Sequence, residues 1–142
     1  YYHRLEMVEN FDNLSDIFFK FGLNLPDSEI PRIQAMIHAE LSDIMVPVTT
    51  GHGNIDLIIP GVHKANGLRI LQKRWGIEDN EVVAFGDSGN DVEMLRQSGF
   101  SFAMANAKAH IKAVARFEAP HNNDEGVLDV IEKVLTKEAP FN

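Results

Sequence analysis

The chain has 142 residues, 44% of them hydrophobic, which is enough to bury the core of one domain or parts of two small ones. Its formal net charge of −8 argues against a nucleic-acid partner, because phosphate backbones are bound by clustered Lys and Arg. It has no cysteine for a disulfide framework and no apolar run long enough to cross a bilayer, so we expect a cytoplasmic protein without membrane contact.

The beginning of the chain predicts one half-buried strand. The first 13 residues mix charges with scattered aromatic side chains, and a helix carrying Tyr2 and Leu5 is one interpretation of them. Residues 17–25 alternate between apolar and polar side chains from Phe19 onward, which is the period of a strand with one buried face.

An amphipathic helix is predicted next. Pro26 ends the strand, and Asp27 or Ser28 is placed to cap the helix. Its apolar stripe consists of Ile30, Ile33, Met36, Ile37 and Leu41. His38 also lies on this helix, and we assign no role to it because a lone helix histidine is more often a surface or packing residue than a ligand.

Residues 45–50 and 54–59 predict two further strands. The short turn between them, centred on His52, is of the kind that joins antiparallel neighbours. His52 at the tip of this turn could contact a ligand, but exposed turn histidines are common, so we assign no role to it. Strand, helix, strand and strand form one small α+β layer, and Pro60 with Gly61 mark its end, so we place a boundary within residues 60–63.

Lys64 opens a second helix, which Gly76 is predicted to end in the left-handed conformation. The inward stripe predicted for this helix consists of Leu68, Leu71, Gln72 and Trp75. A lysine is unfavourable at a helix start, because the helix dipole favours cations at the other end. A bound phosphate would compensate for that cost, so Lys64 is a candidate functional residue, the alternative being an exposed lysine tolerated at small cost.

The central stretch follows an acidic connection, residues 78–81, that we expect to be a solvated loop. Residues 82–85 are all apolar, which is typical of a buried strand in a parallel sheet, and a helical pattern begins after Asp91. Asp87 and Asn90 therefore lie where the carboxyl end of a strand meets a helix start, the place at which open α/β sheets bind ligands.

Two carboxylates on this turn suggest a metal site. Asp87 and Asp91 offer the hard oxygen ligands that suit Mg²⁺, and Asn90 adds a donor for a phosphate oxygen or a metal-bound water. A structural alternative remains open, because Ser88 with Asp91, and Asn90 with Glu93, have capping-box spacing and the turn could simply start a helix.

The rest of the chain predicts two short strands and two helices. The strands are residues 100–104 and 117–119, and the helices are residues 107–115 and the segment after a polar loop at 122–125. Asn106 lies at the end of the first of these strands, where it could meet a ligand or cap the following helix.

Four segments together resemble the haloacid dehalogenase-like phosphohydrolases, and most closely their Cof-type sugar phosphatases. Residues 86–91 resemble the family's fourth motif, G-D-x-x-N-D, and residues 102–107 resemble the segment that follows it. Lys64 stands where the Cof-type branch has its third-motif lysine, and residues 122–127 are similar to the stretch before its last helix. The order and spacing of these segments make the resemblance specific.

The resemblance implies a fold and a division of the chain. The fold is α/β, part of a parallel-sheet core preceded by the end of an α+β cap domain. Residues 1–60 would be the carboxyl-terminal part of the inserted cap, and residues 61–142 the second half of the core.

It also implies a function: Mg²⁺-dependent hydrolysis of sugar phosphates or similar small phosphorylated metabolites through an aspartyl-phosphate. Asp87 would bind Mg²⁺, Asp91 would support the metal site, Lys64 would neutralise nucleophile and phosphate, and Asn90 would hold the phosphate. The family's nucleophile lies in an Asp-x-Asp-x-Thr motif, and the chain contains no such run. We therefore expect an amino-terminal part of the same protein to supply it, and these 142 residues alone to be inactive. The alternative is a non-catalytic module that binds Mg²⁺ or a partner.

Overall fold

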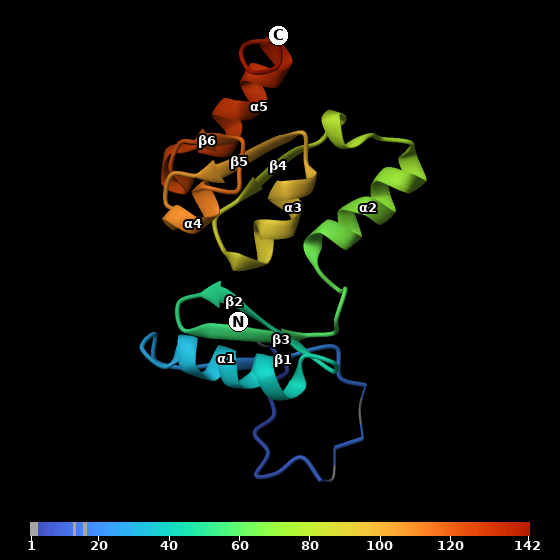
Figure 1. Cartoon of the computed structure of the whole chain (residues 1–142), viewed down its shortest axis with the longest axis vertical. Helices are drawn as coiled ribbons and strands as arrows, with labels where there is room; N and C mark the ends of the chain where they lie inside the picture. Colours follow the sequence, from blue (N-terminus) through green and yellow to red (C-terminus); the bar gives the residue numbers. More distant parts are fainter. Residues whose placement is uncertain (1–2, 13, 16) are drawn as a thin grey trace.

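The computed structural model describes residues 3–12, 14–15 and 17–142, and it has two stacked layers, each built on a three-stranded sheet (Figure 1). The strand order is β1-β3-β2 in the first layer and β4-β5-β6 in the second. The predicted α/β class with a parallel sheet is confirmed, because β5 pairs in parallel with both β4 and β6.

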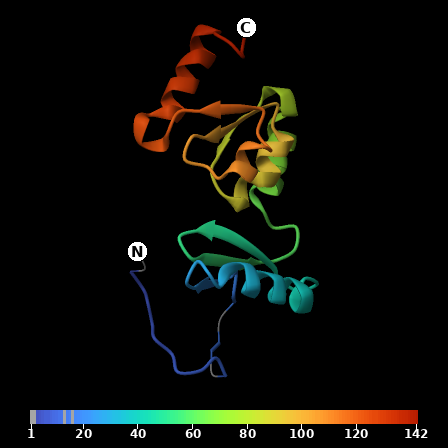
Figure 2. The same ribbon diagram turned by 60° about the vertical axis from the view of Figure 1, so that its left-hand side comes forward.

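The first layer is an antiparallel sheet covered on one face by a helix. Its elements are β1 (Phe21–Asn24), α1 (Ile30–Leu41), β2 (Val46–Gly51) and β3 (Asn54–Ile58). β3 pairs with both neighbours, and Ile37 of α1 is buried with Ile55 and Leu57 of β3. Figure 2 shows α1 on the side of this sheet away from the second layer, so the uncovered side of the sheet is directed toward that layer.

The second layer surrounds the parallel sheet with helices. Its strands are β4 (Val83–Gly86), β5 (Phe100–Met104) and β6 (Phe117–Ala119). Its α-helices are α2 (Lys64–Trp75), α3 (Val92–Gln97), α4 (Ala109–Lys112) and α5 (Gly126–Thr136). Three 3₁₀ turns complete it: η1 (Asp79–Glu81), η2 (Gly89–Asp91) and η3 (Asn122–Asp124).

Strand β5 is buried on both faces, and its one polar side chain, Ser101, accepts a hydrogen bond from the Arg116 N–H at 3.1 Å. Ala103 packs on one side with Leu95 and Ile111, whereas Phe102 belongs to a cluster on the other side that includes Val130 of α5. Because side chains alternate between the two faces of a strand, neighbouring residues of β5 enter different clusters. The parallel register pairs Gly86 with Ala103 and Met104 with Ala119, so the three strands of the second layer end at the same edge.

Two expectations for the first layer are wrong. The first strand begins at Phe21, and the Phe19 side chain is 84% exposed. The cause is the strand register: Phe21 pairs with Leu57, so Phe19 would lie opposite Ile59, beyond the end of β3. The cap of α1 is also different, because Glu29 occupies that position without a side-chain hydrogen bond to the helix. The described residues before β1 form no helix, and Tyr2 lies outside the described part.

Three expectations for the second layer need correction. Residues 78–81 contain the turn η1, in which the Asp79 side chain accepts a hydrogen bond from the Gln72 amide at 2.9 Å. The helix predicted for residues 107–115 is only α4. The predicted stripe of α2 is covered in part: Gln72 is buried but Trp75 is 63% exposed. The predicted end of α2 is confirmed, since Gly76 has a φ of 68°.

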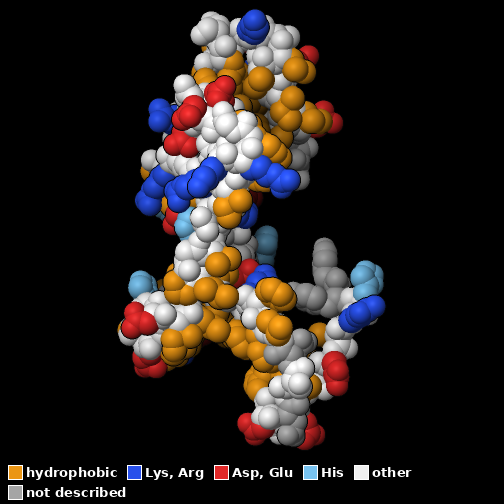
Figure 3. All heavy atoms as spheres, turned by 90° about the vertical axis from the view of Figure 1, so that its right-hand side faces the viewer, with side chains coloured by type: hydrophobic (Ala, Val, Ile, Leu, Met, Phe, Trp, Pro, Cys, Tyr) orange, Lys and Arg blue, Asp and Glu red, His pale blue; other side chains and the backbone are white. Residues whose placement is uncertain are grey.

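Strand β4 lies at the edge of the second sheet. Within the described residues it pairs only with β5, so its other edge has no strand beside it. Large apolar side chains are exposed on α2 and on the connection between the layers, and Figure 3 shows hydrophobic side chains at the surface on this side of the molecule. They are Ile59, Val62, Ile70 and Trp75, each at least half exposed.

No helix in the described ranges combines the length and apolar character that crossing a membrane requires.

Candidate active site

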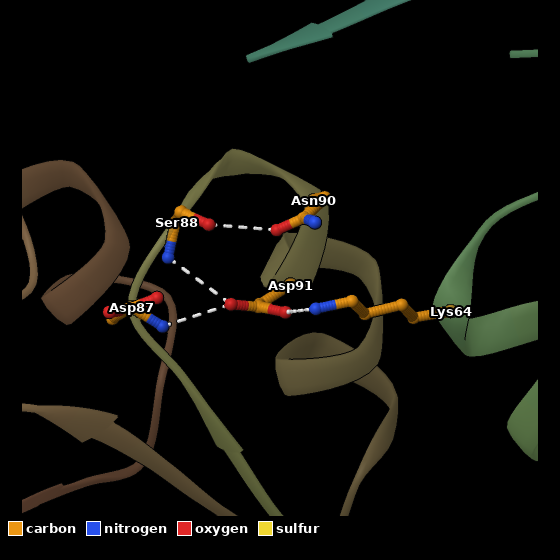
Figure 4. Close-up of polar contacts among 5 residues, drawn as sticks. All are labelled: Lys64, Asp87, Ser88, Asn90 and Asp91. Atoms are coloured by element: carbon orange, nitrogen blue, oxygen red, sulfur yellow. Dashed lines mark hydrogen bonds and ion pairs between the residues drawn. The ribbon is translucent and has the colours of Figure 1, made fainter. Parts of the chain in front are cut away.

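The candidate site forms where β4 ends and the chain turns into η2 and α3 (Figure 4). Gly86, the last residue of β4, allows this turn to be tight. A Cβ atom at Gly86 would lie 2.5 Å from the Cβ of Asp91, a distance that no pair of side chains tolerates. The absence of a side chain at Gly86 therefore lets Asp91 fold back against the end of the strand.

Asp91 is the buried centre of the turn, with 4% of its surface exposed. Its Oδ2 accepts hydrogen bonds from the backbone N–H groups of Asp87, at 2.9 Å, and Ser88, at 3.2 Å. Its Oδ1 lies 2.5 Å from the Lys64 Nζ (Figure 4). The contact with Ser88 agrees with the capping alternative, and the contact with Lys64 shows that capping is only part of what Asp91 does.

Lys64 is the first residue of α2, and its side chain reaches this turn. The helix start is capped by His63, whose Nδ1 accepts a hydrogen bond from the Asn66 N–H at 3.3 Å. The Lys64 side chain remains half exposed although its ammonium contacts Asp91. Asp91 therefore stabilises the ammonium at an unfavourable helix end and fixes its position, while leaving it accessible to a second anion.

Asp87 is exposed and is linked to the loops that follow the next two strands. Its Oδ2 accepts a hydrogen bond from the Asn106 Nδ2 at 2.9 Å, and the Asn106 Oδ1 accepts one from the Asn122 N–H at 3.3 Å. Lys108, and not Asn106, is at the cap position of α4, so the alternative of a helix cap at Asn106 is wrong. Asn106 instead holds Asp87 at the carboxyl edge of the sheet.

Asn90 completes the group of predicted site residues. Its Oδ1 accepts a hydrogen bond from the Ser88 hydroxyl at 2.8 Å, which orients the side-chain amide. Figure 4 shows its nitrogen on the side away from Ser88. Asn90 can therefore donate to an anion next to the turn, and all four predicted residues, Lys64, Asp87, Asn90 and Asp91, lie around one strand end.

Two cavities adjoin this strand end. The smaller, about 310 Å³, is lined by Lys64 and Asn90 and by Lys20 and Asp56, which form an ion pair at 2.8 Å. The larger, about 690 Å³, is lined by Asp87 and Ser88, by the β2–β3 turn, and by the loops after β5 and β6. Both volumes are in the range of small-molecule sites. The site thus opens toward the first layer.

The residues at the turn fit Mg²⁺ in their chemistry. Asp87 offers an exposed carboxylate oxygen, and hard oxygen ligands are what Mg²⁺ prefers, with water filling its remaining positions. Both oxygens of Asp91 are already engaged, so Asp91 lies behind Asp87 as a support. Within the described ranges no three His, Asp or Glu side chains are grouped closely enough to hold a metal ion. An ion bound at Asp87 would need water, substrate or further protein oxygens to complete its coordination.

Comparison with known proteins gives consistent matches. The family described as haloacid dehalogenase-like hydrolase matches residues 2–131. The 5-amino-6-(5-phospho-D-ribitylamino)uracil phosphatase YbjI of Escherichia coli (strain K12) is 69% identical over 142 residues, which are 100% of this chain and 52% of that protein.

Solved structures agree with these sequence matches. The structure of SMU.1108c from Streptococcus mutans UA159 superposes with a TM-score of 0.87 and 41% identity, covering 91% of this chain and 49% of that one. A HAD/COF-like hydrolase from Plasmodium vivax superposes with a TM-score of 0.78 and 27% identity, covering 84% of this chain and 42% of that one. The chain therefore spans about half the length of the proteins it matches.

Proposed function

The chain belongs to the haloacid dehalogenase-like hydrolases, and on that premise we propose that it carries the electrostatic half of a Mg²⁺-dependent phosphomonoester hydrolase. The observation that supports this most is the arrangement of Lys64, Asp87 and Asp91. One ammonium and one exposed carboxylate are held on either side of a buried carboxylate at the end of a parallel strand. Such a fixed pair of opposite charges suits a phosphate bound together with a divalent cation.

Each residue has a distinct part in this proposal. The Lys64 ammonium binds a phosphate oxygen and neutralises charge on the phosphoryl group, and the Asn90 amide donates to another oxygen. Asp91 fixes Lys64 and the backbone of the turn. Asp87, oriented by Asn106, would hold Mg²⁺, which supplies a Lewis acid for the phosphate oxygens when bound.

The nucleophile in this proposal comes from an amino-terminal part of the same protein. The chain has no Asp-x-Asp-x-Thr run, whereas the family forms its aspartyl-phosphate on the first aspartate of that motif. One edge of β4 has no partner strand in the part of the chain that the structure describes, which supports the proposal, because a parallel strand added there would end beside Asp87 and Lys64. In this proposal residues 1–60 form the end of a cap and residues 61–142 part of a core. One buried apolar cluster in the first layer and two separate ones in the second support this division.

The proposed substrates are sugar phosphates and similar small phosphorylated metabolites. The relative from Escherichia coli is named for 5-amino-6-(5-phospho-D-ribitylamino)uracil, so this compound is the first candidate. The larger cavity is compatible with a polyhydroxylated leaving group, because Thr49, Thr50, Asn54 and Asn123 are among the residues that line it.

We expect the natural protein that contains this chain to release phosphate from 5-amino-6-(5-phospho-D-ribitylamino)uracil or from sugar phosphates, and to do so only with Mg²⁺. Phosphate release is measured for a panel of phosphomonoesters with Mg²⁺ and then with EDTA. Restoration of activity when Mg²⁺ is added back serves as the control. If the protein hydrolyses no compound of the panel, the phosphatase proposal is contradicted, and a module that only binds Mg²⁺ or a partner is favoured.

A further inference from the structure

The tip of the β2–β3 hairpin forms one wall of the larger cavity. Gly51, His52 and Gly53 line the cavity together with Asp87 and Ser88 of the active-site turn. Figures 1 and 2 show this tip beneath the carboxyl ends of the strands of the second layer. A residue at the tip can therefore contact a leaving group whose phosphate is bound at the turn.

The backbone holds His52 in one position at this tip. Three successive residues have positive φ angles, 88° at Gly51, 51° at His52 and 77° at Gly53. The Asn54 amide donates to the carbonyl groups of Gly51, at 3.1 Å, and His52, at 3.2 Å. A Cβ atom at Gly53 would lie 2.3 Å from the Leu25 carbonyl oxygen, so the turn is packed tightly against the end of β1.

A histidine in the left-handed region costs about 1–2 kcal/mol, a cost that glycine at the same place would avoid. Strained positions of this kind persist where the surrounding structure fixes them, and they cluster at sites that bind ligands. The strain alone assigns no role, but here it coincides with a cavity shared with the active-site turn.

The other walls of the cavity carry hydrogen-bonding side chains. Lys108 and His110 line it from the segment after β5, and His121 lines it from the segment after β6. Only two lining residues are aliphatic, Ile30 and Pro31. The Lys108 ammonium can only donate, and imidazole and amide groups can donate as well as accept, so these walls can hydrogen-bond a leaving group that presents several acceptors.

We infer that His52 is a specificity-determining residue, which contacts the end of the leaving group remote from the phosphate. The favoured substrates are phosphomonoesters in which a polyhydroxylated chain ends in an acceptor-rich group such as a ring bearing carbonyl oxygens. A cavity of about 690 Å³ leaves room for such a group beyond the phosphorylated chain. The inference rests on the proposed function, because it takes the phosphate to lie at Lys64 and Asn90, beside a Mg²⁺ ion held by Asp87. Lys64 and Asn90 line the smaller cavity, so the leaving group would extend past Thr50, which lines both cavities, into the larger one.

Two substrates that differ only at the remote end test the inference. 5-Amino-6-(5-phospho-D-ribitylamino)uracil carries the ring, and ribitol 5-phosphate has the same phosphorylated chain without it. The quantity measured is the ratio of kcat/KM for the first to kcat/KM for the second, in the natural full-length protein. His52→Gly removes the imidazole and keeps the turn, because glycine adopts the positive φ without strain.

The ratio is expected to exceed one in the wild type and to fall about tenfold or more in His52→Gly, mainly through KM for the ring-bearing substrate. His38→Ala is the matched control, since His38 is exposed on α1 and lines neither cavity, and its ratio should equal that of the wild type. Circular dichroism and thermal unfolding check that both variants fold.

A wild-type ratio below one, or an equal ratio in wild type and His52→Gly, would overturn the inference while leaving the phosphatase proposal in place. A wild-type protein that hydrolyses neither compound nor any other phosphomonoester would overturn the proposed function, and this inference with it.

Discussion

Replacing Asp87 by Asn in the natural protein is expected to lower the rate of Mg²⁺-dependent phosphate release by about 10²- to 10³-fold or more, which in practice abolishes the activity. Asp87 is the exposed carboxylate of the turn; its Oδ2 accepts from the Asn106 amide, and its Oδ1 has no hydrogen-bond partner among the described residues. The substitution keeps the shape of the side chain and removes its charge, so a cation held there would lose its principal ligand. The measurements are turnover and the Mg²⁺ concentration that gives half-maximal rate.

The free energy of unfolding shows whether Asp87→Asn has lost only the metal site or has also lost the fold. Asp87→Asn should change the free energy of unfolding by about 0.5 kcal/mol or less, because the residue is exposed and the amide oxygen can still accept from Asn106. Asp43→Asn is the matched control, an exposed acid that lines neither cavity. If Asp87→Asn leaves turnover and the Mg²⁺ requirement unchanged, the metal assignment is wrong.

Residues 1–142 expressed alone are expected to be inactive and to associate, or to unfold in part. Among the described residues no strand pairs with the outer edge of β4, so its backbone donors and acceptors can pair with another chain. Exposed apolar side chains on α2 add to this tendency. Sedimentation velocity measures the association, and hydrogen exchange reports on residues 82–85. The amino-terminal part of the protein, supplied in the same chain or separately, should restore a compact state and activity.

Two lysine substitutions test which surface associates. Trp75→Lys, at the end of α2, should reduce association because it places a charge on the apolar side chains of that helix. Leu135→Lys is the control, since Leu135 is 78% exposed on α5, which packs with β6 at the opposite edge of the sheet. A stable monomer with strong protection of residues 82–85 would show that β4 needs no further strand and that our placement of the chain in a larger core is wrong.

The sequence predicted local elements well because their signals are local. The strand, turn and helix around residues 82–97, the antiparallel hairpin and the end of α2 at Gly76 all follow from apolar period and turn residues. The start of β1 could not be predicted, because it depends on where its partner β3 ends. The exposure of Trp75 likewise depends on which elements cover α2, and the spacing of apolar residues along this helix cannot predict them.

The candidate site was predicted as a set of residues but not as an arrangement. Lys64 and Asp91 are 27 positions apart, and no local pattern shows that their side chains meet. This contact engages one oxygen of Asp91 and the backbone of the turn engages the other, which fits the supporting role expected for this residue. The contact between Asn106 and Asp87 joins two loops after parallel strands, and only the sheet register brings them together.

The central proposal is that this chain stabilises phosphoryl transfer electrostatically. Substitution of Lys64 tests it most directly. The rate of aspartyl-phosphate formation is measured by rapid quench in the natural protein with saturating substrate and Mg²⁺. Lys64→Met alone would leave Asp91 buried without its cation, so the double variant Lys64→Met/Asp91→Asn, which removes both charges, is measured beside it. Both variants are expected to form the phosphoenzyme about 10²-fold or more slowly than the wild type. A wild-type rate in the double variant would contradict the proposal and make Lys64 and Asp91 a structural ion pair.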